Sequence, residues 1–387
     1  MSVTLHWFLP TNGDSRSDLS LGNAVGAAGS RVAADGSSGD RRPTLEYLTQ
    51  IAVAAEQNGF TGALTPTSSW CEDALVTAAA LSQHTDAFKY LVAFRPGMQR
   101  PTYAAHQFAT FQRLTGNRLL LNVVVGGDDL EQRRYGDALG KDDRYARAGE
   151  ALHVIRELWA ASGEPVTFKG EHLWVEGAQI EAPDVAPEIF FGGSSPAAIE
   201  VAGRYVDVYL TWGEPPAAVA EKLELVRAAA ARHDREVRFG IRLHAIARDT
   251  ADDAWNEADR LLSGLDPKQI EAAQLIQRAS QSEGQRRMTA LHGGGNTDNL
   301  VVAPNLWAGV GLVRGGAGTA LVGSHEEIAD RIAEYHELGI DHFVLSGYPH
   351  LEEAYRFGEC VTPVLRRRGL LAGAGSAQGA TTTGGQS

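Results

Sequence analysis

Short apolar runs alternate with longer amphipathic segments along most of the chain. The clearest run, at 118–126, is followed by an amphipathic segment at 144–161. Near-continuous apolar runs predict strands buried on both faces, and a 3.6-residue repeat predicts the helices that cover them. The predicted strands are 5–9, 61–66, 89–95, 118–126, 188–193, 206–212, 238–247 and 341–346. The predicted helices begin at about residues 43, 72, 101, 144, 196, 215, 252 and 325, and a terminal helix spans 351–366.

These units predict an α/β protein with a (β/α)₈ TIM-barrel fold, because about eight strand–helix units close such a barrel. The alternative is a doubly wound open sheet, which usually has fewer strands and often a glycine-rich dinucleotide turn after the first. Here that turn is Pro10-Thr11-Asn12-Gly13-Asp14, without the G-x-G-x-x-G pattern. We therefore expect one barrel domain over residues 1–370.

Four segments interrupt the alternation. The charged segment 11–42, rich in Gly, Ala and Ser, predicts a long surface loop, and 166–176 predicts an inserted β-hairpin. The segment at about 265–323 predicts an insertion that is helical early, then glycine-rich, and that acts as a lid. The composition of 371–387 predicts a disordered tail.

One predicted strand, 238–248, carries two unusual residues. Arg242 and His244 are two positions apart, so their side chains share the face opposite the apolar one. A cation and an imidazole on the inner side of a strand are costly without partners. These two side chains either find their partners within the core or line a site for an anion, and we favour the anion site.

Composition narrows the partners. The chain has 387 residues, 43% of them hydrophobic, and a formal net charge of −13, which argues against general nucleic-acid binding. The two cysteines, Cys71 and Cys360, fit a reducing cytoplasm, and no cluster of metal ligands has recognisable spacing. We expect no membrane span, because no run of about 18 apolar residues occurs. The N-terminal ten residues lack signal-peptide features, so we expect a cytoplasmic protein.

A phosphate site is one candidate at the carboxyl ends of the strands, where barrel enzymes place their active sites. Ser194 and Ser195 follow a strand and a glycine turn and precede Pro196. Free N–H groups and hydroxyls there can hold a phosphate, although a serine N-cap explains them equally well. Tyr145 opens another helix and could reach the same phosphate, or lie on the surface.

Four further side chains are candidates, each with a simpler explanation. Asn122 lies in an apolar strand and needs partners, which the polar edge of a planar cofactor would supply. Trp212 ends a strand and could line the pocket or pack under the next helix. Cys71 precedes a predicted helix start, where the pKa of a thiol can fall, or is a small buried residue. Arg314, in a glycine-rich loop, could clamp an anion or be a solvated cation.

Longer motifs carry a family resemblance. The segments are 7–11, 71–74, 190–195, 209–216, 238–244, NLWAGVGLVRGGAGTALVG at 305–323 and LSGYPHLEEAY at 345–355. On these motifs the chain resembles the flavin-dependent, luciferase-like monooxygenases, and within them the two-component alkanesulfonate monooxygenases. The resemblance covers about residues 5–360 and implies a TIM barrel.

The resemblance also implies an activity. Such enzymes use O₂ and reduced FMN, supplied by a separate NAD(P)H-dependent FMN reductase, to cleave the C–S bond of a small organosulfonate, giving an aldehyde and sulfite. Relatives are homo-oligomers. By motif, Arg242 and His244 match the family's catalytic arginine and histidine, while Cys71, Arg314, Tyr348 and Trp212 match other active-site positions. Arg242, His244, Arg314, Tyr348 and Trp212 are thus also the expected substrate contacts.

Two departures from the family pattern put the substrate in question. Position 12 is Asn where a His is typical, and Trp70 stands where a smaller or cationic residue is usual. The open alternatives are a sulfo-sugar such as sulfoquinovose, a non-sulfonate substrate such as an amine or heterocycle, and a non-catalytic flavin-binding protein. A deazaflavin in place of FMN is a further possibility.

Overall fold

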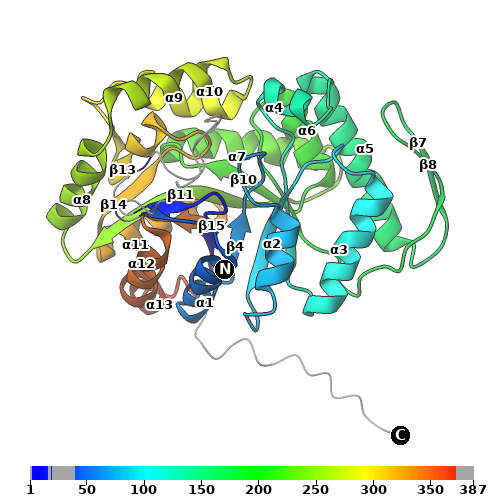
Figure 1. Cartoon of the computed structure of the whole chain (residues 1–387), viewed down its shortest axis with the longest axis horizontal. Coiled ribbons are helices and arrows are strands. Elements are labelled where there is room, and N and C mark those ends of the chain that lie inside the picture. The colour runs from blue at the N-terminus through cyan, green and yellow to red at the C-terminus, as the bar shows by residue number, and fades with distance from the viewer. Residues whose placement is uncertain (1, 16–18, 20–39, 372–387) are drawn as a thin grey trace, which may run out of the picture.

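Parallel strands close into a barrel in the computed structural model, which describes residues 2–15, 19 and 40–371 (Figure 1). The eight barrel strands, in order around the barrel, are β1 (Thr4–Phe8), β4 (Gly62–Thr65), β5 (Lys89–Phe94), β6 (Leu119–Val123), β9 (Ile189–Phe191), β10 (Val208–Trp212), β11 (Arg238–Arg248) and β15 (Ile340–Ser346). The pairing of β10 with β11 closes the ring. These are the eight predicted strands, so the (β/α)₈ barrel is confirmed and the open sheet is excluded.

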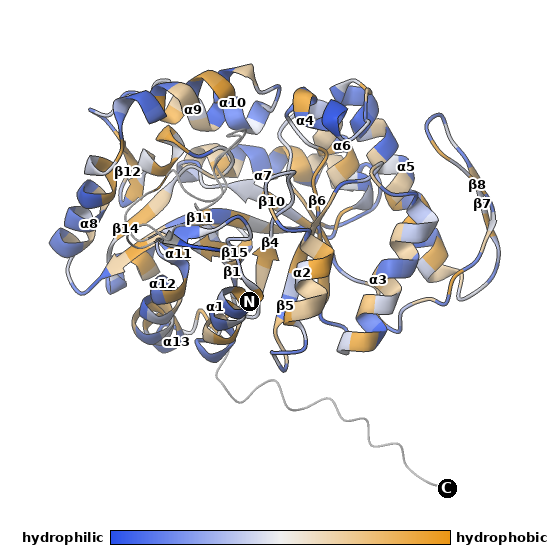
Figure 2. Ribbon diagram, in the orientation of Figure 1, coloured by the Kyte–Doolittle hydropathy of each residue, from blue (hydrophilic) through white to orange (hydrophobic). Residues whose placement is uncertain are grey.

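Helices surround the barrel, and most of them carry polar residues on their outer faces (Figure 2). They are α1 (Leu45–Gln57), α2 (Ala74–Leu81), α3 (Pro101–Thr115), α5 (Lys141–Ala160), α6 (Pro196–Tyr205), α7 (Pro216–Ala231), α8 (Ala251–Ser263), α11 (His325–Glu337), α12 (His350–Arg356) and α13 (Thr362–Arg367). Local chemistry sets their starts: Thr44 caps α1 through Tyr47 N, and Ser324 and Glu327 form a capping box on α11.

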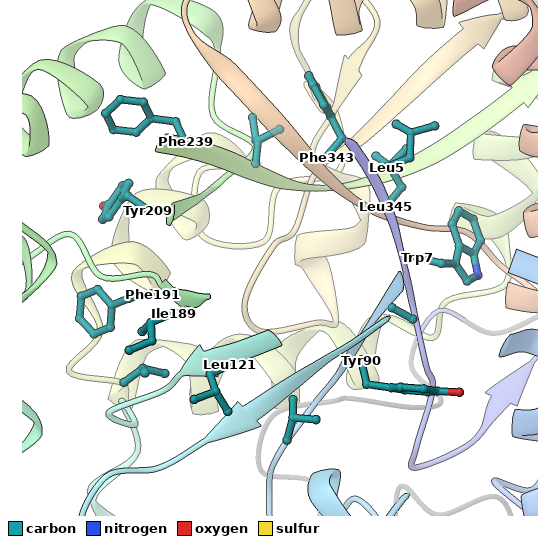
Figure 3. Packing of buried hydrophobic residues seen from close by; sticks show 14 of the residues in the cluster. Leu5, Trp7, Tyr90, Leu121, Ile189, Phe191, Tyr209, Phe239, Phe343 and Leu345 are labelled. Atoms are coloured by element: carbon teal, nitrogen blue, oxygen red, sulfur yellow. The ribbon is translucent and has the colours of Figure 1, made fainter. Parts of the chain in front are cut away.

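The core has two layers separated by the strands. Side chains such as Leu5, Trp7 and Phe343 stand on the outer face of the barrel and pack under the helices (Figure 3). Alternate residues point inward and form a second apolar cluster, which comprises Phe8, Leu64, Leu91, Leu120, Phe190, Val208, Leu210 and Val344. This inner cluster fills the barrel, so a ligand can enter only at its rim.

Strand β11 is longer than its neighbours and changes partner along its length. Its first half pairs with β10, and residues 244–248 pair with β14 (Ala320–Ser324). Strands β13 (Leu306–Trp307) and β12 (Val301–Ala303) extend that edge in antiparallel fashion. The predicted insertion at 265–323 also contains α9 (Pro267–Ala279), α10 (Glu283–Leu291) and the 3₁₀ turn Gly309–Leu312. Its helical start is confirmed, whereas β14 was missed, because its short apolar run is continuous with the glycine-rich segment.

Other segments agree in part. The hairpin of β7 (Val166–Lys169) and β8 (Trp174–Ala178) is confirmed and projects from the barrel (Figure 1), whereas the short helix α4 (Asp129–Arg134) was not predicted. The prediction of a surface loop from residue 11 is wrong for its start: residues 11–15 are buried, and β2 (Asp14–Ser15) pairs with β3 (Asp40–Arg41). The rest of that loop, except for residues 19 and 40–42, lies outside the described residues, as do positions 372–387 of the predicted tail. No helix among the described residues is long and apolar enough to cross a membrane.

Candidate functional site

A cavity of about 380 Å³ opens at the carboxyl end of the barrel strands. Its walls come from the segments that follow β4, β5, β6, β9 and β10, and its roof from residues 280–288 and 315–316. The roof is joined to the barrel, because Lys141 Nζ donates to Gln281 O at 2.6 Å and Gln281 N donates to Gly127 O at 3.2 Å. The insertion therefore covers the rim where barrel enzymes hold their ligands, as the predicted lid would.

Arg242 places a buried cation in the wall of this cavity. Its side chain points into the barrel, with Cζ 4.7 Å from the centre of the Phe8 ring. Nη1 donates to Leu243 O at 2.5 Å, and Nη2 donates to Ser346 Oγ at 2.9 Å. Burial lowers the pKa of Arg242 to about 10, so the guanidinium stays charged at neutral pH. No carboxylate among the described residues pairs with it, which leaves a cation at the cavity that an anion can neutralise.

His244 lies beside Arg242 but behind the cavity wall. Its Nδ1 is 2.6 Å from Ser346 Oγ, and its Nε2 is 2.9 Å from Ala317 O. Burial, followed by the charge of Arg242, lowers the pKa of His244 well below its usual range. The shared strand face of Arg242 and His244 is thus confirmed, with both side chains buried at 7% and 4% exposure.

Tyr348 and Arg314 continue the same buried group. The Tyr348 ring stacks on His244 with centroids 5.3 Å apart, and Arg314 Cζ lies 4.6 Å from the centre of the Tyr348 ring. Burial raises the pKa of Tyr348, and its hydroxyl meets no partner among the described residues. Arg314 is itself buried, and its Nε donates to Leu19 O at 2.6 Å, so it is not a solvated loop cation. Neither side chain reaches the cavity surface formed by the described residues.

Cys71 does line the cavity, but its setting differs from the expected one. Helix α2 begins at Ala74 and is capped by Asp73, so the thiol is not at the helix end. Cys71 Sγ lies 3.1 Å from Ser68 Oγ, and burial raises the pKa of the thiol. Of the two explanations for Cys71, a lowered thiol pKa is therefore wrong, because burial outweighs the nearby dipoles and the thiol stays protonated at neutral pH.

The predicted phosphate residues come together on the wall formed by the segments that follow β6 and β9. Tyr145, Ser194 and Ser195 all line the cavity. Ser195 caps α6 by accepting from Ala198 N at 3.3 Å. A Cβ on Gly193 would lie 3.2 Å from Tyr145 Oη and 2.6 Å from Ala198 Cβ, so only glycine leaves the backbone bare here. Tyr145 is buried, so the alternative that it lies on the surface is wrong.

Asn122 and Trp212 also belong to the lining. Asn122 projects into the barrel from β6, and its amide makes no hydrogen bond to any described residue. The amide is therefore available to a ligand. Trp212 is half-buried: its indole packs against α10, where a Cβ on Gly284 would lie 2.9 Å from Trp212 Cζ3. The first explanation, that Trp212 lines the pocket, thus holds, whereas the helix against which it packs is α10 of the insertion and not the next helix in the chain, α7.

Two charged pairs in the lining were missed. Lys222, on α7, is buried, pairs with Glu214 and donates to Thr211 Oγ1 at 3.0 Å. Arg95, at the end of β5, donates to Glu131 Oε2 at 2.9 Å. The position of Arg95 at the end of a predicted strand indicates the rim, but its pairing with Glu131 does not follow from the sequence. Lys222 carried no signal, because a lysine on an amphipathic helix normally faces water.

A further buried network supports the Tyr348 region. Asp14 Oδ1 accepts from His350 Nδ1 at 2.9 Å, and Asp14 Oδ2 accepts from Tyr47 Oη at 2.6 Å. The His350 ring meets the Tyr348 ring edge to face, with centroids 5.2 Å apart. The sequence did not predict this network, because Asp14 lies in the segment 11–42, whose composition predicts a surface loop.

Comparison with known families agrees with this geometry. The sequence model described as "Luciferase-like monooxygenase" matches residues 23–342, most of the chain. The chain belongs to the luciferase-like monooxygenase family. Membership accounts for the barrel and for a cavity at its carboxyl rim; the alkanesulfonate branch is a finer assignment than the match gives.

Solved structures share this luciferase-like fold at low sequence identity. A riboflavin lyase with modified FMN and riboflavin superposes with a TM-score of 0.77 at 19% identity, covering 96% of this chain and 93% of that one. A long-chain alkane monooxygenase gives 0.74 at 19% identity, over 96% and 93%. The EDTA monooxygenase of Chelativorans sp. BNC1 gives 0.71 at 19% identity, over 96% and 95%. At this identity the likeness concerns the fold alone.

Proposed function

We propose that this luciferase-like monooxygenase is a two-component enzyme that uses reduced FMN and O₂ to cleave the C–S bond of a small organosulfonate. One oxygen atom of O₂ goes to the carbon, giving an aldehyde, and the other is reduced to water. Sulfite leaves, and reduced FMN supplies the two electrons. An NAD(P)H-dependent reductase that supplies the flavin is part of the proposal, as is a homo-oligomer.

The observation that carries the proposal is the buried, uncompensated guanidinium of Arg242 in the cavity wall. A sulfonate is a permanent anion with three acceptor oxygens, so it suits a fixed fork of N–H donors. Nη1 is used by backbone carbonyls and one Nη2 hydrogen by Ser346, while Nε–H meets no acceptor among the described residues. A bound anion would provide both the missing acceptor and the missing countercharge.

The wall formed by β6, β9 and the segments that follow them fits FMN. Tyr145, Ser194 and Ser195, with the bare backbone at Gly193, would hold the phosphate at the start of α6. The unpartnered amide of Asn122 would bind the polar edge of the flavin ring. When bound, the reduced flavin supplies the electrons that activate O₂. A deazaflavin would suit the same fold, and difference absorbance on adding each cofactor separates the two.

The residues behind Arg242 have supporting roles in this proposal. Tyr348 holds its proton, because burial raises its pKa, and Arg314 lies over its ring. Both residues are proposed to shape and polarise the end of the cavity where the sulfonate sits, as is Trp212 at its rim. The roof formed by 280–288 excludes water from the bound flavin. Cys71 would contact the substrate as a neutral thiol.

The substrate's organic part is proposed to lie near Trp70 and Asn12, which also line the cavity. An indole and an amide suit a ring that bears hydroxyl groups, so a sulfo-sugar is the second candidate. The test is sulfite release in the presence of a flavin reductase, NAD(P)H, FMN and O₂. The panel comprises short alkanesulfonates, aromatic sulfonates and sulfoquinovose. Sulfite from none of them would refute the proposal, and a mass-spectrometric screen would then identify any non-sulfonate product.

A further inference from the structure

A buried chain of hydrogen bonds runs from the cavity wall to the glycine-rich segment of the insertion. Arg242 Nη2 donates to Ser346 Oγ at 2.9 Å, and Ser346 Oγ lies 2.6 Å from His244 Nδ1. His244 Nε2 lies 2.9 Å from Ala317 O, and the Ser346 side chain has no solvent exposure. The chain thereby joins β11, β15 and the segment that precedes β14.

The chemistry of its two ends fixes the direction of the two outer bonds. A guanidinium can only donate, and a backbone carbonyl can only accept. His244 Nε2 must therefore carry a hydrogen, which it gives to Ala317 O. Ser346 Oγ accepts from Arg242, and it donates its own hydrogen to His244 Nδ1 when that nitrogen carries none. Every donor and acceptor in the chain is satisfied when His244 is neutral and protonated on Nε2 alone.

The surroundings of His244 favour that state. The ionisable groups near the ring are Arg242 on the same strand, Arg314 from the insertion, Tyr348 stacked on the ring and His350 at the start of α12. Two of these are cations, and no carboxylate among the described residues contacts the imidazole. Both ring nitrogens are already used, so neither is open to a ligand in the cavity.

We propose that Ser346 is a positioning residue whose hydroxyl couples Arg242 to His244, so that the neutral imidazole orients the guanidinium instead of exchanging a proton with the ligand. Arg242 keeps its carbonyl partners Leu243 and Val344 on Nη1, and Ser346 fixes the other end of its fork. The identity of the anion held by Arg242 rests on the proposed function, whereas the state of His244 does not.

The coupling also reaches the roof of the cavity. Ala317, which accepts from His244, lies between Gly316 and Gly318, and Gly316 lines the cavity. A displacement of this segment would remove the acceptor of His244 Nε2–H and disturb the bond to Ser346. The hydrogen-bond chain thus links Arg242 to a segment that forms part of the roof.

Nitrogen NMR of the FMN-loaded protein with ¹⁵N-labelled histidine is the primary test. His244→Gln identifies the signals of His244. The expected spectrum shows the neutral, Nε2-protonated form throughout pH 5.5–8, with a changed Nδ1 signal in Ser346→Ala. An imidazole that titrates between pH 6 and pH 7.5, or one protonated on Nδ1, would overturn the proposal. The wild-type spectrum decides even if Ser346→Ala does not fold.

Calorimetric binding of ethanesulfonate to the same FMN-loaded protein separates positioning from packing. Ser346→Ala should weaken binding about five- to tenfold, as expected for the loss of one ordinary hydrogen bond, and Ser346→Thr should restore most of it. Ser82→Ala is the matched control, because it removes another buried hydroxyl, bonded to Ala79 O at 2.8 Å, far from the cavity. Equal affinity in Ser346→Ala and wild type would refute positioning. Absence of sulfite from every sulfonate, with the NMR result as expected, would count against the proposed function alone.

Discussion

Replacing Arg242 with lysine should make anion binding depend on pH in a range where the wild type is insensitive. The site holds its cation without a countercharge, and burial lowers the pKa of Arg242 from 12.5 to about 10. Burial disfavours the charged form of any cation placed there. A lysine starts from a lower ordinary value and so should lose its proton within the working range.

The size of the expected pH effect follows from the same lowering of the pKa by burial. Burial that lowers the arginine from 12.5 to about 10 would take a lysine from about 10.4 to about 8. At pH 7 both side chains are charged. At pH 9 roughly nine in ten lysines would be neutral, whereas roughly nine in ten arginines would still be charged. Affinity for a sulfonate should therefore fall about tenfold between pH 7 and pH 9 in Arg242→Lys and hardly at all in the wild type.

The assay is calorimetric binding of ethanesulfonate to the FMN-loaded protein at pH 6–9.5 and constant ionic strength. Arg238→Lys is the matched control, because Arg238 lies on the same strand at the opposite end of the barrel, where it pairs with Glu188. Lys222 titrates equally in all three proteins, so its effect cancels in the comparison. A pH-independent affinity in Arg242→Lys, or a fall of equal size in Arg238→Lys, would refute the placement of the anion at Arg242.

Three further predictions concern the cofactor, the thiol and the buried network. Tyr145→Phe and Ser195→Ala should each weaken FMN binding about tenfold but leave riboflavin binding unchanged, because riboflavin lacks the phosphate; equal losses for both ligands would place the phosphate elsewhere. Cys71→Ser should change kcat/KM less than about threefold, and alkylation of Cys71 should accelerate only above about pH 9; a thiolate at pH 7 would contradict the site. Asp14→Asn should lower the free energy of unfolding at pH 7 by about 3 kcal/mol in urea melts. Burial acts to raise the pKa of Asp14, but contact with His350 lowers it overall, so this stabilisation is present above about pH 3.9 and is lost as the pH falls below that value. If wild type and Asp14→Asn differed in unfolding free energy at pH 2 as much as at pH 7, the lowered pKa of Asp14 would be contradicted.

The barrel could be predicted because its strands are buried on both faces and so read as continuous apolar runs, as at 118–126. Strand β14 was not predicted because only residues 320–322 are apolar, and they directly follow the glycine-rich stretch. Helix α4 was not predicted because six residues are too few for a helical period to be recognised. The burial of residues 11–15 was not predicted, because their polar side chains form hydrogen bonds with residues far along the chain, such as that of Asp14 with His350.

The candidate site was predictable where strand geometry alone decides. The spacing of Arg242 and His244 placed them on one face, and the strand ends brought Ser195 and Asn122 to the cavity. The separation of Arg242 from His244 by the cavity wall was not predictable, because it depends on Ser346 and Ala317, which lie far along the chain. Pairings of that kind are properties of the packed molecule.

The central claim is that this cavity cleaves a carbon–sulfur bond with reduced flavin and O₂. The measurement that tests it most directly is sulfite release from the sulfonate panel, with flavin reductase, NAD(P)H and FMN, in parallel with Arg242→Met. The proposal predicts one sulfite and one aldehyde for each sulfonate consumed, strict dependence on O₂ and FMN, and a loss of at least about tenfold in kcat/KM for the variant. Sulfite from no sulfonate, or turnover unchanged in Arg242→Met, would contradict it.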